Sequence, residues 1–283
     1  MLEFTGMGSV LRGLGFLYWV IAIGAISLAL IKGKTPHAKA LWATVAVAVF
    51  GYLPGKALIE QYQRDAYAKE AWAYFKKLCD EKSGEKIYKT HTGVKSVLVV
   101  KPLPPATEKD LYDQFWYGDP YSNATPWNER GEQGAIRMTG IFRSTTGDQT
   151  GLEFVEIPGD DTGKYFYRLK SLDRYPYQTR SGTENSTSRF GVSWEDVSTL
   201  QDRKYWIAAS RLRVIDLSDN SIVAERIGYF IEAGFGSTGG GRRPWLTSRG
   251  PNTTCPPLRN GDYEDRWFVL KSLIPTEGIQ NGK

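Results

Sequence analysis

The sequence predicts a membrane-anchored α+β protein, in which a two-helix transmembrane hairpin precedes a docking helix and a β-rich soluble domain. Three observations predict this fold class. Two uncharged apolar runs lie in the first sixty residues, a stretch with helical periodicity follows them, and the rest of the chain alternates apolar and polar residues as strands do. The expected organisation is an N-terminal tail at 1–13, a hairpin at 14–55, an amphipathic connecting helix at 56–84 and a mainly antiparallel domain at 85–283.

The two apolar runs cover about 14–31 and 40–55. A helix needs about 20 mostly apolar residues to cross the hydrocarbon core, so each run is near the required length. Trp42 and Tyr52 lie near the ends of the second run, where interfacial aromatic residues are expected. A signal peptide is an alternative for the first run, and a buried helix of a soluble protein is an alternative for the second.

Basic residues between the runs predict the orientation of the hairpin. Lys32, Lys34 and Lys39 favour a cytoplasmic turn, which puts the residues after about 56 on the opposite side. The expected location is a bacterial inner (plasma) membrane with a periplasmic domain. Lys56 and Arg64, just after the second run, act against this orientation.

The net charge of +5 does not indicate nucleic-acid binding, because it is concentrated in the hairpin region. Residues 1–61 hold five basic and two acidic side chains, which leaves +3 there and +2 for the rest of the chain. Nucleic-acid-binding domains usually gather their basic residues on one face of the folded domain. The sequence therefore predicts a bilayer as partner and no nucleic acid.

Cys79 and Cys255 are the two cysteines of the chain, and both lie in the part predicted to be exported. An even count in an exported domain favours a disulfide. Two unrelated buried thiols are the alternative.

The connecting helix is predicted from apolar residues at a spacing of three to five, with a stop at Ser83-Gly84. The apolar positions are Leu58, Tyr62, Tyr67, Ala71, Phe75 and Leu78. Such a stripe packs against the rest of its own domain or, as an alternative, pairs with a second copy through a homo-oligomer.

Strands are expected over most of the remaining sequence. A hairpin is predicted from 87–91 and 95–101 around Thr92-Gly93, and a second, clearer one from 210–216 and 222–230. The other predicted elements are a short helix at 108–115 and strands at 136–143, 151–157, 164–173, 188–197 and 266–271.

Histidine-dependent catalysis is disfavoured, because His37 and His91 are the only histidines. Neither a Ser-His-Asp arrangement nor a zinc site is indicated, so we expect no catalytic residue, no metal and no cofactor. The acidic pairs Asp160-Asp161 and Glu195-Asp196 keep a carboxylate-dependent envelope hydrolase as the least favoured alternative.

The segment 234–245 is the most distinctive part of the domain and contains a G-x-G-x-x-G pattern. Pro244 and the triple glycine argue against the helix that a dinucleotide site needs. The segment is therefore either a plain loop or a site for a small anion or a glycan. The candidate binding residues are Gly236, Gly239, Gly240, Gly241, Arg242, Arg243 and Trp245.

Aromatic residues are the other surplus, and four of them surround a proline-bearing loop: Trp116, Tyr117, Tyr121 and Trp127. They form part of the core or a surface for a partner such as an envelope protein. The leading functional expectation is a non-enzymatic, membrane-anchored binding protein that contacts an envelope protein or glycan. The alternative is a sensor or effector with a cytoplasmic domain. It would bind a phosphate-bearing signal at the segment 234–245, which we call the Gly-Arg loop, and act on the membrane.

Overall fold

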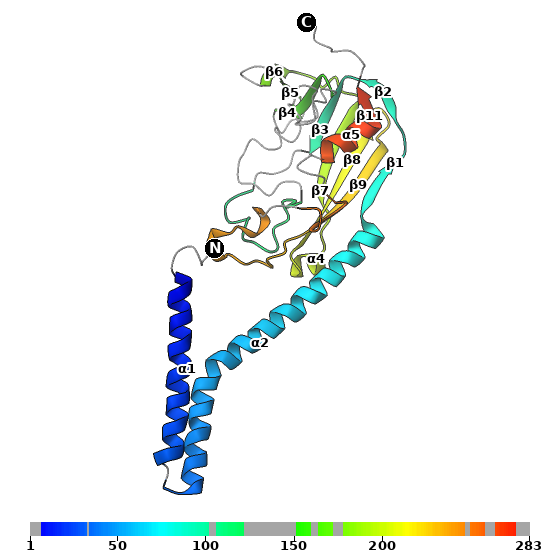
Figure 1. Cartoon of the computed structure of the whole chain (residues 1–283). Helices are drawn as coiled ribbons and strands as arrows, with labels where there is room; N and C mark the ends of the chain where they lie inside the picture. The colour runs from blue at the N-terminus through cyan, green and yellow to red at the C-terminus, as the bar shows by residue number, and fades with distance from the viewer. Residues whose placement is uncertain are drawn as a thin grey trace. The chain divides into compact units, whose positions relative to one another are not determined.

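The chain divides into two compact units, Met1–Lys69 and Glu70–Lys283, in the computed structural model (Figure 1). Each unit is considered by itself below. The structure describes residues 7–32, 34–101, 106–121, 151–159, 164–171, 178–246, 250–257 and 264–275. The predicted strand at 136–143 lies outside these ranges.

The first unit is a pair of helices, α1 (Met7–Lys32) and the beginning of α2 (Pro36–Lys82), joined by a tight turn. Thr35 begins α2, since its side-chain oxygen accepts a hydrogen bond from the Ala38 N–H at 3.3 Å, and Pro36 occupies the first helical position. The two helices meet where the Tyr18 hydroxyl donates to the Phe50 carbonyl oxygen, with the two rings 5.9 Å apart. Ala22 of α1, four residues after Tyr18, is buried.

Both helices present large apolar side chains outward. Each is long and apolar enough to cross a membrane, judged by length and composition, and almost none of either apolar window is buried. The exposed side chains include Phe16, Trp19, Ile23, Leu41, Val47 and Leu53. Within the described residues, the apolar window of the second run is not buried in the structure.

The structure joins the second apolar run and the connecting helix into one element, because α2 continues through Pro54 to Lys82. It ends where the stop was predicted: the Ser83 hydroxyl donates to the Cys79 carbonyl oxygen at 2.7 Å, and Gly84 adopts a φ of +146°. Of the predicted apolar stripe, Ala71, Phe75 and Leu78 are buried. Leu58 and Tyr62 are exposed.

The second unit is built on a mixed, mostly antiparallel sheet of nine strands within the described residues. Its order is β1-β9-β8-β7-β3-β4-β5-β6, with β10 also paired to β9 (Figure 1). Among the described strands of this sheet, the pairs of β3 with β4 and with β7 are parallel and the others are antiparallel. The strands are β1 (Gly84–Ile87), β3 (Ser96–Lys101), β4 (Phe154–Pro158), β5 (Phe166–Ser171), β6 (Gln178–Thr183), β7 (Phe190–Asp196), β8 (Ile207–Asp216), β9 (Ser221–Ile231) and β10 (Thr254–Cys255).

The remaining elements flank this sheet. A separate parallel pair joins β2 (His91–Val94) to β11 (Leu273–Pro275). The short helix α4 (Leu200–Lys204) precedes β8. Two 3₁₀ turns, η2 (Gly239–Gly241) and η3 (Pro244–Leu246), follow β9, and α5 (Glu264–Ser272) comes near the end of the described chain.

Side-chain alternation along β8 distributes its residues between the two faces of the sheet. Ile207 and Ala209 pack with Phe75 of α2 on one face. Leu212 and Val214 belong to the opposite face and contribute to the main core. Figure 1 shows α5 lying against β8 and β9, and Phe268 and Val269 of this helix are buried in the same core.

The predicted hairpin of 210–216 and 222–230 is confirmed as β8 and β9, whose antiparallel register runs from Ile207 opposite Ile231 to Asp216 opposite Ser221. The turn between them is closed by Asn220, which has a φ of +58°. Strands predicted at 151–157, 164–173 and 188–197 appear as β4, β5 and β7 with shifted ends.

The predicted final strand at 266–271 is wrong, because these residues lie in the helix α5. A short continuous apolar run does not distinguish a strand from a buried helix. The helix is fixed to the sheet by Asp265, which accepts a hydrogen bond from Trp194 Nε1 at 2.9 Å and forms an ion pair with Arg226. Phe268 and Val269 can then pack on the sheet from one helical turn.

Two local predictions near the start of the domain are also wrong. The segments 87–91 and 95–101 do not form a hairpin, since β1 pairs with β9, β2 pairs with β11 and β3 lies inside the sheet. The segment 108–115 forms successive turns, with N–H to carbonyl bonds from Asp110 to Thr107 at 3.1 Å and from Tyr112 to Lys109 at 3.0 Å. Pairing with distant strands and local Thr and Asp hydrogen bonds outweigh the local sequence preferences here.

Candidate functional site

The described segment 106–121, which holds Trp116, Tyr117 and Tyr121 and is called the aromatic loop below, meets the Gly-Arg loop around Trp245. The Trp245 ring is fully buried, and its Nε1 donates to the Asp113 carbonyl oxygen at 2.6 Å. The Trp245 backbone N–H donates to the Leu111 carbonyl oxygen at 3.2 Å. Its ring lies 5.1 Å from that of Trp206, so this residue joins both loops to the start of β8.

The Gly-Arg loop already surrounds a carboxylate of its own chain. Glu232, at the end of β9, is fully buried and accepts hydrogen bonds from the N–H groups of Gly234 and Gly236 at 2.9 and 2.7 Å. Arg242 forms an ion pair with the same carboxylate. The loop thus has the chemistry of an anion site, and the anion that fills it is intramolecular.

Two glycines of this loop lie close to other side chains, and at Gly236 a larger residue would also be strained. A Cβ atom on Gly234 would lie 1.6 Å from the Arg242 guanidinium, and one on Gly236 would lie 2.2 Å from the Trp206 ring. Gly236 also has a φ of +78°, which disfavours other residues. The glycines therefore allow the chain to close around Glu232.

Of the other candidate residues of this loop, Arg243 forms an ion pair, Trp245 is buried and the three glycines of η2 are exposed to solvent. Arg243 forms an ion pair with Glu108 of the aromatic loop at 2.8 Å. Trp245 is buried, so its ring offers no exposed stacking face. Gly239, Gly240 and Gly241 are exposed in η2. Binding of an external anion or glycan at this loop stays a prediction.

The aromatic loop divides into buried and exposed members. Tyr121 is buried and Trp116 is partly buried, whereas Tyr117 keeps 52% of its surface exposed. Tyr112 and Phe115, which were not singled out from the sequence, are each 41% exposed. Trp127 lies outside the described residues. We call Tyr112, Phe115, Trp116 and Tyr117 the aromatic surface.

A buried arginine, which was not singled out from the sequence, lies near Tyr117 of the aromatic surface. The Arg203 side chain of α4 is fully buried, and its guanidinium lies 5.6 Å from the Tyr117 ring and 5.1 Å from the Trp245 ring. It forms an ion pair with Asp196. Burial lowers the pKa of Arg203, and the Asp196 carboxylate opposes this effect.

Hydrogen bonds to α4 hold this arrangement in place. Gln114 of the aromatic loop donates to the Arg203 carbonyl oxygen at 2.8 Å. Thr199 and Asp202 form a capping box at the start of the helix. The Tyr74 hydroxyl of α2 donates to Asp202 at 2.8 Å, and burial together with this carboxylate raises the pKa of Tyr74 to about 12. These hydrogen bonds therefore hold α4 to the aromatic loop through Gln114 and to α2 through Tyr74.

Glu156 is a second buried carboxylate that sequence reasoning missed. It accepts hydrogen bonds from the Ser186 hydroxyl at 2.6 Å, the Ser188 hydroxyl at 2.8 Å and Arg168 Nε at 2.9 Å. Burial alone would raise the pKa of Glu156, but these hydrogen bonds outweigh it and lower the pKa to about 2. A carboxyl group with such a pKa is poorly suited to general acid catalysis near neutral pH.

The acidic pair Glu195-Asp196 lies on β7, and its members separate as strand neighbours do. Glu195 is half-exposed and pairs with Arg211 at 3.3 Å, while Asp196 is buried beside Arg203. The pair Asp160-Asp161 lies outside the described residues. Among the described residues, no group of three or more His, Cys, Asp or Glu side chains is placed to hold a metal ion.

Cys79 and Cys255 are paired in a disulfide, with their Cα atoms 5.6 Å apart. The bond joins α2 to β10 and lies beside the cluster that contains Phe75 and Leu78. The pairing expected from the cysteine count is thus present in the structure.

No protein-family model, curated protein or solved structure matches this chain.

Proposed function

We propose that this protein is a membrane-anchored, non-enzymatic binding protein whose β-rich domain lies outside the cytoplasm and contacts an envelope partner. The observation that carries the proposal is the exposure of the apolar side chains on α1 and on the first part of α2. Exposed apolar area of this extent is stable only when lipid or another apolar surface covers it.

Charge supports the orientation in this proposal. The sequence contains no Asp or Glu between Phe4 and Ile59, while Lys32, Lys34 and Lys39 lie in or beside the turn. A basic turn is retained in the cytoplasm by the positive-inside rule, so the domain that follows the second helix is outside. A Cys79–Cys255 disulfide is compatible with an oxidising compartment.

The aromatic surface is the proposed contact for the partner. Tyr and Trp are enriched at the centres of interfaces, because they combine a large apolar area with a polar group. The hydrogen bond from Gln114 to the Arg203 carbonyl oxygen joins the aromatic loop to α4, and Arg203 itself pairs with Asp196 of β7. A fixed surface loses little conformational entropy when it binds.

A site-specific photo-crosslinker at residue 117 tests this function in intact cells of the native host. Tyr88 is the matched control position, since it is also an exposed tyrosine of the same unit, with 57% of its surface exposed. We expect a discrete polypeptide adduct from position 117 and none from position 88. Equal adducts from both positions, or none from either, would contradict the proposal.

A further inference from the structure

We propose that the groove between α1 and α2 at the turn end of the hairpin binds one anionic phospholipid of the bilayer. This inference rests on the membrane insertion proposed above. It assigns to the hairpin a specific lipid site in addition to its role as an anchor.

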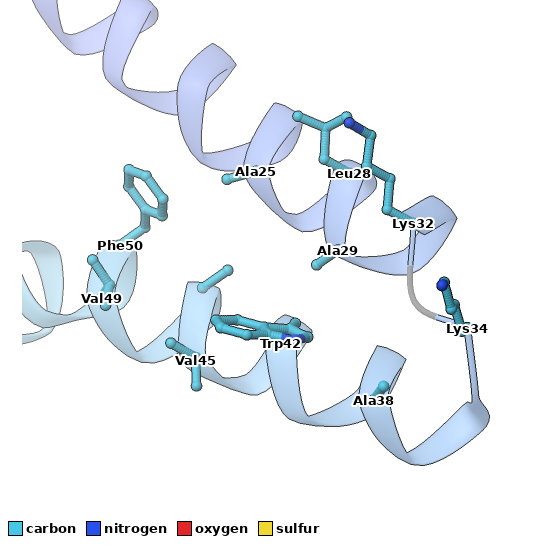
Figure 2. A pocket seen from close by; sticks show the side chains of 11 residues that line it. Ala25, Leu28, Ala29, Lys32, Lys34, Ala38, Trp42, Val45, Val49 and Phe50 are labelled. Atoms are coloured by element: carbon cyan, nitrogen blue, oxygen red, sulfur yellow. The ribbon is translucent and has the colours of Figure 1, made fainter.

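The groove has a volume of about 680 Å³ and lies between the two helices of the first unit (Figure 2). Its walls include Ala25, Ala29, Ala38 and Trp42, with Lys32 and Lys34 at the turn end. Figure 2 shows Phe50 at the other end of the groove, far along α2 from the two lysines. One ligand in this groove would meet an apolar surface along most of its length and cationic groups at one end.

Small residues are the reason that the groove exists. The helices are in contact where Tyr18 meets Phe50, but Ala25 and Ala29 on α1 and Ala38 on α2 are too short to fill the space nearer the turn. Small residues usually allow membrane helices to approach closely. Here the two helices do not close on them, and the space remains open for an acyl chain.

The two lysines have no acidic neighbour in this part of the chain. The sequence holds no Asp or Glu between Phe4 and Ile59, so the hairpin supplies no carboxylate to neutralise Lys32 and Lys34. Basic side chains between membrane helices on the cytoplasmic side attract phosphate headgroups. Trp42 is 60% exposed at the groove and suits the headgroup level of the membrane.

Charge also argues against a second copy of this chain as the occupant. Two copies inserted with the same orientation and related by a two-fold axis would bring Lys32 and Lys34 of each copy to the same depth. Four ammonium groups would then face one another with no acidic residue between them. A phospholipid with a negative headgroup supplies the complementary charge.

The test uses the full-length protein, first in membranes and then in mixed micelles. Extraction of membranes with alkaline carbonate establishes whether the chain is integral. Native mass spectrometry then measures retention of phosphatidylglycerol and phosphatidylcholine with the same acyl chains, supplied in equal amounts. We expect at least a fivefold preference for phosphatidylglycerol, since one lysine near an anionic group contributes roughly a factor of five.

Two matched pairs of variants locate the site. The double variant Lys32→Gln/Lys34→Gln should abolish the preference, whereas Lys39→Gln/Lys56→Gln, which removes the same charge from residues outside the groove, should retain it. Ala29→Phe should fill the groove and reduce retention of both lipids. Leu30→Phe, at an exposed position of the same helix, should not.

Each contrary result is distinguishable. Release of the chain by carbonate would overturn the membrane anchor and the lipid site together. An integral protein with equal retention of both lipids, or equal loss in both double variants, would overturn the lipid site alone. A dimer that Ala29→Phe dissociates would show that a second copy fills the groove.

Discussion

Glu232 and Arg203 are buried charged residues that pair with residues of the same chain. Their charges are therefore already neutralised within the domain. Glu232 accepts from two backbone N–H groups and pairs with Arg242. Arg203 pairs with Asp196 beneath two aromatic rings. The Gly-rich pattern predicted an arrangement that suits an anion, but no local pattern shows that Glu232, just before the loop, supplies that anion.

The substitution Glu232→Gln should destabilise the domain by about 2–4 kcal/mol, because it leaves Arg242 without its buried counter-ion. Arg243→Gln is the matched control, since it removes the ion pair with Glu108 at the surface, where such pairs contribute about 0–1 kcal/mol. Chemical denaturation of the full chain in detergent, followed by tryptophan fluorescence, measures both. Equal effects of the two substitutions would contradict the role given to Glu232.

Glu156 predicts a defined acid sensitivity. Folding lowers its pKa from 4.5 to about 2, so its contribution to stability is complete above pH 4.5 and is lost as the pH falls from 4.5 towards 2. The variant Glu156→Gln should be less stable at pH 7 and should lose less stability than the wild type over this pH range. Unfolding measured at several pH values tests this, and parallel curves for the two proteins would be contrary evidence.

Among the helices and strands, those formed by neighbouring segments of the chain could be predicted from the sequence. The β8–β9 hairpin has a turn and a regular alternation, so both its existence and its inward residues Leu212 and Val214 follow from the sequence. The helix α5 could not be recognised, because its apolar run has no clear period and its anchor Asp265 pairs with residues far along the chain. The pairing of β2 could not be recognised either, because its partner β11 lies near the end of the described chain.

The disulfide connects two elements with a sequence separation of 176 residues. Its removal should destabilise the protein by about 5 kcal/mol in the chain-entropy model, because it closes a long loop in the unfolded state. Thermal unfolding of the wild type with and without reductant measures this effect. The double variant Cys79→Ser/Cys255→Ser should unfold at the temperature of the reduced wild type, and reductant should not change its unfolding temperature. A change in the unfolding temperature of this variant on addition of reductant would contradict the explanation.

At the scale of the whole molecule, the distribution of charge and apolar residues carries most of what sequence can predict. Two apolar helices, a basic turn and a mixed, mostly antiparallel sheet domain are all visible in composition and periodicity. The aromatic surface is harder to predict from composition and periodicity. Tyr112, Phe115 and Tyr117 are exposed, whereas Tyr121 and Trp245 are buried. This division depends on contacts between distant segments.

We propose that the hairpin spans a membrane with its basic turn inside and the sheet domain outside. Labelling with a membrane-impermeant maleimide tests it most directly, with His37→Cys in α2 beside the turn and Lys89→Cys in the domain, both at exposed positions. The wild type is the background control, because its two cysteines are joined. In bacterial cells with a permeabilised outer membrane we expect Lys89→Cys to be labelled, and His37→Cys to be labelled only after detergent is added. Labelling of His37→Cys in intact cells, with Lys89→Cys protected, would contradict this orientation.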